Sequence, residues 1–162
     1  NLILKNQPFF MRQLKEKPIT LFENLSIVLT GFSRADIVGT GLLRTYFDTV
    51  KKELGKETLE AILNALQHIK ISNPEHLSDK DSRQIADLMN NINFKTPVGQ
   101  IIQLWYLGEW VVGTFNPKNY IISSESYLEG LIWKAIAAHP MGGKQPGYGT
   151  WGFPPQTFSS KN

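Results

Sequence analysis

The residues that most often carry catalysis or metal binding are few in this chain and are poorly spaced for either role. The three histidines, His68, His76 and His139, form no H-x-x-x-H or H-E-x-x-H pair that would place two ligands on one helix face. The sequence has no cysteine, which excludes thiolate catalysis, Cys-ligated zinc or iron–sulfur sites and disulfides. We therefore predict that this chain has no catalytic residue and binds neither cofactor nor metal.

Other polar patterns have simpler structural interpretations. Gly39-Thr40-Gly41 lacks the third glycine of a dinucleotide fingerprint, and Gly142-Gly143-Lys144 lacks the spacing of a phosphate loop. Asp79 and Asp81 follow Ser78, at a predicted helix start where the helix dipole favours acidic residues. None of these patterns requires a phosphate ligand or an acid catalyst.

Composition indicates one globular domain. The 162 residues are 41% hydrophobic and 11% aromatic, which is too apolar for a disordered chain. The net charge of +3 is too small, without a clustered basic patch, to indicate a nucleic-acid partner. No apolar run approaches the roughly 20 residues that span a bilayer, and no secretory signal is visible.

Apolar residues recur at three- and four-residue spacing along most of the chain, which is typical of amphipathic helices. We predict six helices, over about residues 20–30, 33–54, 59–69, 78–92, 96–107 and 124–138. Only Tyr120-Ile121-Ile122 has the character of a short strand. The predicted fold is an all-α bundle of about six helices, followed by an extended C-terminal tail rich in glycine, proline and aromatic residues.

Helix boundaries are predicted from capping chemistry. Capping boxes are expected at Thr20 with Glu23, at Ser33 with Asp36 and at Ser78 with Asp81, and Thr96-Pro97 is a favoured N-cap and N1 pair. Gly39 and Gly41 lie early in the second predicted helix, where each lowers helix propensity by about 1 kcal/mol relative to alanine. We interpret them as positions that permit a close helix crossing.

Three segments are predicted: an N-terminal arm (1–17), a helical bundle (18–139) and a C-terminal strap (140–162). The arm is interpreted as a frayed end, with contact to a partner or an anionic surface as the alternative. The strap holds five of the 13 glycines and four of the nine prolines, yet its aromatic residues favour burial. It is expected to pack either on its own bundle or on a partner.

All four tryptophans lie in the second half of the chain. Trp105 and Trp133 occupy helical positions and are interpreted as core residues. Trp110 and Trp151 lie in predicted loops, where tryptophan often anchors an interface. For Trp110, a core role and an interface role are equally compatible with the sequence, whereas an interface role is favoured for Trp151.

Four motifs, in order, are similar to one known family. They are Phe22-x-x-Leu25-Ser26-x-x-Leu29-Thr30-Gly31, Ile101-Ile102-Gln103-Leu104-Trp105-Tyr106-Leu107-Gly108, Ile122-x-x-Glu125-x-x-Leu128 with Leu131-Ile132-Trp133, and Pro146-Gly147-Tyr148-Gly149-Thr150-Trp151-Gly152-Phe153-Pro154-Pro155. Over about residues 22–155, the chain resembles the small (gamma) subunit of bacterial membrane-bound, FAD-dependent sugar and polyol dehydrogenases, the sorbitol, fructose and glucose dehydrogenase group. It departs from the family pattern in lacking a twin-arginine signal and in having Gly149 and Thr150 before Trp151.

The resemblance implies a helical accessory subunit that carries no cofactor of its own. In the family, this subunit binds a large FAD-containing catalytic subunit of glucose–methanol–choline type, supports its folding and brings it across the inner membrane on a twin-arginine signal. A multihaem cytochrome c subunit, holding haem c, often anchors the complex and passes electrons to quinone. The implied compartment is the periplasm, with membrane association only through the complex.

A partner interface is predicted in the fifth helix, the loop after it and the strap. Its residues are Trp105, Tyr106, Trp110, Pro146, Gly147, Tyr148, Trp151, Phe153 and Pro154. The alternative function is a stand-alone helical binding or inhibitor protein, of the immunity type, with no enzyme partner. An enzyme in its own right is the least favoured class, because no nucleophile, metal or phosphate constellation is visible.

Overall fold

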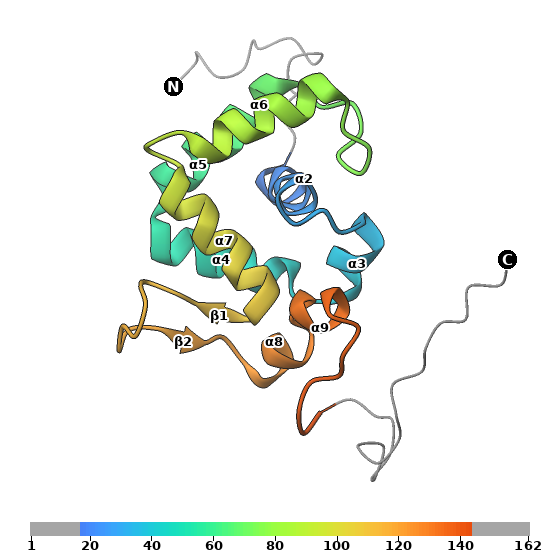
Figure 1. Cartoon of the computed structure of the whole chain (residues 1–162). Coiled ribbons are helices and arrows are strands. Elements are labelled where there is room, and N and C mark those ends of the chain that lie inside the picture. The colour runs from blue at the N-terminus through green and yellow to red at the C-terminus, as the bar shows by residue number, and fades with distance from the viewer. Residues whose placement is uncertain (1–16, 144–162) are drawn as a thin grey trace, which may run out of the picture.

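The computed structural model describes residues 17–143, and most of this part of the chain is helical (Figure 1). The helices are α2 (Pro18–Thr30), α3 (Arg34–Gly39), α4 (Leu43–Leu54), α5 (Lys56–Ile69), α6 (Asp79–Asn90), α7 (Lys95–Leu107), α8 (Ser124–Leu128) and α9 (Leu131–Ala135). Two short strands, β1 (Glu109–Trp110) and β2 (Tyr120–Ile121), pair antiparallel, with Glu109 opposite Ile121. The predicted all-α class is confirmed. The arm up to residue 16 and the strap from residue 144 lie outside the described residues.

Helix α2 is the central element of the fold. Figure 1 shows it nearly end-on, with the other long helices around it, and it contacts α3, α4, α5 and α7. Its apolar residues are spread around most of its circumference, as expected for a helix surrounded by others. Phe22 and Leu25 are completely buried, and the Phe22 ring meets Phe47 of α4 edge-to-face with centroids 5.6 Å apart.

Two of the predicted capping boxes are confirmed. The Ser33 and Ser78 hydroxyls each accept the backbone N–H three residues on, at 3.1 Å, and Asp36 and Asp81 accept the return bonds. The box predicted at Thr20 is wrong, because α2 begins two residues earlier, with Pro18 in its first turn and Lys17 as N-cap. Proline at this position has no N–H to leave unsatisfied, which favours the earlier start.

The second predicted helix is broken into α3 and α4. Gly41 adopts a left-handed φ of +71°, and the Thr40 hydroxyl accepts the backbone N–H of Leu42 at 3.1 Å. The buried Leu42 side chain is thereby turned into the core. The expected close helix crossing at Gly39 and Gly41 is wrong, because a Cβ atom at either position would have open space around it.

Two other boundaries also differ from prediction. The last predicted helix is divided into α8 and α9 at Gly130, where a Cβ atom would lie 2.8 Å from the Tyr106 carbonyl oxygen. Helix α7 begins at Lys95, so Pro97 is its third residue, still within the first turn where no N–H is needed. The predicted strand near Tyr120 is confirmed, whereas β1 was not predicted. None of the described helices has the length and apolar character required to cross a membrane.

Candidate functional site

The first two family-like motifs meet in the core through buried hydrogen bonds. The Trp105 indole Nε1–H donates to the Ser26 hydroxyl at 2.9 Å, and that hydroxyl donates to the Phe22 carbonyl at 2.7 Å. Beside it, the Tyr106 phenol donates to the Thr30 carbonyl at 3.1 Å. These bonds satisfy polar atoms that burial would otherwise make costly, and they fix α7 in register against α2.

The third motif is joined to the second at Gly108. This glycine ends α7 with φ +68°, and its carbonyl oxygen lies 3.0 Å from the Ile122 backbone N–H and 2.8 Å from the Ser126 hydroxyl. A Cβ atom at Gly108 would lie only 2.1 Å from the Ser126 carbonyl oxygen. The closeness of the two backbones therefore requires glycine at this position.

The tryptophan of the third motif is also held by the chain itself. The Trp133 indole donates to the Tyr127 carbonyl at 2.7 Å, and the two rings meet edge-to-face with centroids 5.4 Å apart. The first three motifs therefore build the scaffold that joins α2, α7, α8 and α9. Within the described residues their most distinctive side chains face inward.

Burial decides between the two interpretations of Trp105 and Trp110. Their exposed fractions are 1% and 2%, so both belong to the core and present no surface for a partner in this structure. Tyr106 is half-buried, and its ring packs edge-to-face against Phe32 at a centroid distance of 5.9 Å. The remaining predicted interface residues, Pro146, Gly147, Tyr148, Trp151, Phe153 and Pro154, lie outside the described residues.

Between residues 17 and 143, no three histidine or acidic side chains lie close enough together to hold a metal ion. His68 is exposed, and its Nδ1 lies 2.6 Å from the Asn64 carbonyl oxygen of the preceding helical turn. Glu75, in the loop between α5 and α6, accepts the Arg34 backbone N–H at 2.8 Å. It therefore ties the α5–α6 loop to the start of α3, a contact that spacing along the chain did not reveal.

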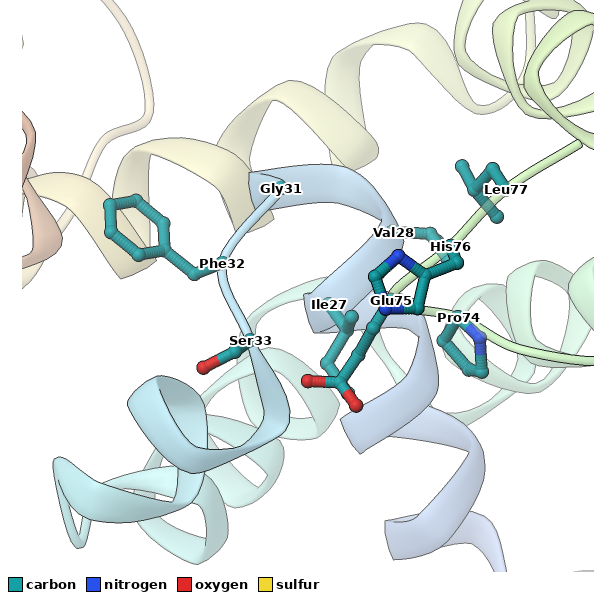
Figure 2. A pocket seen from close by; sticks show the side chains of 9 residues that line it. All are labelled: Ile27, Val28, Gly31, Phe32, Ser33, Pro74, Glu75, His76 and Leu77. Atoms are coloured by element: carbon teal, nitrogen blue, oxygen red, sulfur yellow. The ribbon is translucent and has the colours of Figure 1, made fainter. Parts of the chain in front are cut away.

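A groove of about 500 Å³ lies between the C-terminal end of α2 and the α5–α6 loop. Figure 2 shows the His76 imidazole and the Glu75 carboxylate projecting from the loop, and Ile27 and Val28 on α2. The lining is Ile27, Val28, Gly31, Phe32, Ser33, Pro74, Glu75, His76 and Leu77. An apolar floor beside one carboxylate and a helix C-terminus suits an apolar segment that carries a basic group.

A polar tie connects α3 to α9. Asp36, already part of the capping box with Ser33, forms an ion pair with Lys134. The hydrogen bond from Lys134, and then that from Ser33, lowers the pKa of the Asp36 carboxyl below its usual value. The ionised carboxylate therefore stabilises both the start of α3 and its attachment to α9.

Acidification is expected to weaken this tie, because the folded state lowers the pKa of Asp36. The stabilisation is complete above the unfolded value of about 4 and is lost as the pH falls through the folded value. At neutral pH, Asp36→Ala should cost on the order of 1 kcal/mol, as for other lost caps. Its melting temperature should then decline less than that of the wild type between about pH 5 and pH 2.

Thermal melts over that range, read by circular dichroism, provide the check. Asp48→Ala is the matched control, since Asp48 is an exposed carboxylate that pairs with Arg44 on the surface of α4 alone. A wild-type pH dependence in Asp36→Ala would show that the carboxylate contributes nothing to acid sensitivity.

Uncovered apolar side chains collect in the C-terminal third of the described chain. The described residues include nine exposed large hydrophobic side chains. Six of the nine fall between residues 112 and 141: Val112, Phe115, Tyr120, Ile121, Ile136 and Met141. In Figure 1 the hairpin, α8, α9 and the last described residues gather at one end of the molecule. This end, termed here the hairpin end, holds most of the exposed large hydrophobic residues of the described chain, and the predicted strap follows it in the sequence.

Comparison of the chain with known proteins found no matching family model, no matching curated protein and no matching solved structure.

Proposed function

We propose that this chain is a non-catalytic accessory subunit of a periplasmic FAD-dependent sugar or polyol dehydrogenase. It would support the folding, export and stability of a large glucose–methanol–choline-type subunit that holds FAD. Haem c would reside in a third, cytochrome subunit. The family-like motifs motivate this proposal, and the hairpin end is the structural observation that carries it.

The division of the chain between scaffold and surface supports a binding role. The core buries Trp105 and Trp110 and satisfies the Trp105 indole N–H with a hydrogen bond. The hairpin end, in contrast, leaves Phe115, Ile121 and Met141 in water. Large apolar side chains that gather at one end of a folded domain are typical of a surface that another protein covers.

In this proposal, hydride transfer belongs to the flavin and the base of the partner, and no residue of this chain is assigned a catalytic role. The complete absence of cysteine fits a subunit that takes no part in electron transfer. Association would be driven by burial of apolar surface, at about 25 cal/mol for each Å² removed from water.

Co-expression tests the proposal directly. Expressed alone, the chain should show no dye-linked sugar oxidation. Expressed with a FAD-containing subunit of glucose–methanol–choline type from the same genome, the chain should co-purify with this flavoprotein and raise its soluble, FAD-loaded fraction. An unchanged yield of FAD-loaded flavoprotein with and without this chain would overturn the proposal.

Removal of the strap is expected to abolish co-purification. A chain that ends at Gly143 keeps every described helix and strand, so its far-UV helicity should be close to that of the full chain. Replacement of Tyr148, Trp151 and Phe153 by serine in the full chain is the matched variant, since it removes the aromatic rings but not the strap. Loss of helicity or of cooperative unfolding in the shortened chain would show that the strap belongs to the core.

The groove favours the second candidate, a stand-alone helical binding or inhibitor protein. Its apolar floor, with Glu75 and His76 at one side, would accept an apolar segment with a basic group. Glu75→Gln combined with Val28→Asp would then abolish ligand binding. Under the accessory-subunit proposal, the same variant should still bind the flavoprotein.

A further inference from the structure

The loop between β1 and β2 displays one aromatic side chain almost completely. Phe115 is 99% exposed and lies midway in sequence between β1 and β2, so it marks the tip of the loop. Figure 1 shows this hairpin extending from the helices. Phe115 also adopts a left-handed φ of +53°, which residues other than glycine rarely do. A phenyl ring is therefore held in water by a backbone conformation that costs free energy, on the order of 1 kcal/mol.

The loop is held in this conformation by its own asparagines. The Asn119 amide oxygen accepts the Val112 backbone N–H at 2.7 Å, and its Nδ2 donates to the Gly113 carbonyl at 2.8 Å. The Asn116 side chain accepts the Lys118 backbone N–H at 3.0 Å. These bonds close the loop locally, so Phe115 is presented by an ordered turn.

The hairpin is also tied to the helices. Gln100 of α7 donates through its Nε2 to the Val111 carbonyl at 2.9 Å, and the Tyr120 phenol donates to the Glu53 carboxylate of α4 at 2.8 Å. The buried Trp110 ring anchors the base of the hairpin in the core. An aromatic side chain on such a rigid support loses little conformational entropy when it is bound.

A protein pocket suits this tip better than a lipid surface. Burial of one phenyl ring is worth about 2–3 kcal/mol, which gives only marginal attachment to a bilayer. Asn116 and Asn119 beside it would have to leave water as well. A concave apolar pocket can enclose the ring while the two amides stay in water at the rim of the pocket. Buried aromatic anchors of this kind are typical of the centre of a protein interface.

Charge further specifies the partner. Lys118 is the only charged side chain between residues 111 and 119, and it is exposed. On the neighbouring end of α4, Lys52 lies 5.6 Å from the Tyr120 ring centroid but pairs with Glu53 at 2.9 Å, so Lys118 is the charge that this loop offers to a partner. The complementary surface is therefore an apolar pocket with an acidic rim.

We propose that Phe115 is the anchor that the β1–β2 loop inserts into an apolar, acid-rimmed pocket of a larger protein. This inference rests on the proposed function, in which that protein is the FAD-containing subunit. The inference adds to the proposed function one specific contact, which the hairpin tip makes independently of the predicted strap contact.

The test measures the affinity of the full chain for a purified FAD-containing subunit of glucose–methanol–choline type from the same genome. Phe115→Gly removes the ring and relieves the positive φ, so the variant should melt no lower than the wild type while its dissociation constant rises at least about tenfold. Phe115→Tyr should retain near-wild-type affinity, and Lys118→Glu should weaken binding most at low salt. The matched control is Ile92→Ala, because Ile92 is 88% exposed in the α6–α7 turn and should change affinity less than about twofold.

Each alternative has its own result. Equal affinity of Phe115→Gly and wild type would overturn this inference and leave the proposed function standing. Failure of the wild-type chain to bind the flavoprotein would overturn both. Binding to vesicles of phosphatidylcholine and phosphatidylglycerol that depends on Phe115, or self-association that depends on it, would assign the tip to a lipid surface or to a second copy and overturn the inference.

Discussion

Gly108→Ala is expected to destabilise the protein by about 4 kcal/mol, the upper end of single-substitution effects. Two costs add at this position. The φ of +68° is unfavourable for any residue with a Cβ atom, and the new methyl carbon would lie 2.1 Å from the Ser126 carbonyl oxygen. The three nearest atoms, which are the carbonyl oxygen and carbon of Ser126 and the nitrogen of Tyr127, all belong to the backbone, so no side-chain rotation relieves the contact. Urea unfolding followed by circular dichroism would measure the loss.

Gly39→Ala is the matched control for this substitution. Gly39 lies at the end of α3 with open space where its Cβ atom would project, so alanine there should be neutral or stabilise by up to about 1 kcal/mol. If Gly108→Ala matched Gly39→Ala in stability, the close approach of α7 and α8 would not exist as described. A large loss would establish that the second and third motifs meet as one structural unit.

Trp105→Ala is expected to cost about 4 kcal/mol, because removing a fully buried indole leaves a large cavity. The ring packs edge-to-face on Tyr46 with centroids 4.7 Å apart, and its Nε1–H bonds Ser26. Ser26 would still donate to the Phe22 carbonyl, so the lost packing dominates the cost. Trp110→Ala should behave similarly, since its side chain is equally buried.

These two variants distinguish a core role from an interface role. Ile92→Ala removes a large apolar side chain that lies in water, and it should change the free energy of unfolding by less than about 0.5 kcal/mol. Wild-type stability combined with loss of flavoprotein binding in Trp105→Ala would restore the interface interpretation. Loss of stability, measured by urea unfolding, would establish that Trp105 acts through the fold.

In the described residues, the scaffold and the proposed binding surface are formed by different side chains. The contacts of Gly108, Ser126, Trp105 and Ser26 hold the helices together, while Phe115 extends from the hairpin tip. Substitutions in the first set are expected to lower stability, and those at Phe115 are expected to lower affinity alone. Measuring both quantities for each variant therefore tests the proposed division of roles.

The sequence by itself determined the helical class and several helix ends, because these depend on local chemistry. The capping boxes at Ser33 and Ser78 join residues three positions apart, and the predicted helix ends at residues 30 and 107 are each followed by a glycine that adopts a left-handed conformation. Apolar spacing likewise located α5 and α6, whose buried faces follow the helical period. The interruption at Gly41 was missed because its two flanking segments share one apolar pattern.

Only the tertiary structure decided which aromatic residues are available to a partner. Trp110 and Phe115 lie five residues apart in a segment that the sequence describes only as a loop. One is buried because the hairpin folds onto α7, and the other is exposed because the Asn119 bonds turn the loop tip outward. Burial of a loop side chain depends on contacts between distant segments, such as Gln100 with Val111 and Glu53 with Tyr120, which no local pattern encodes.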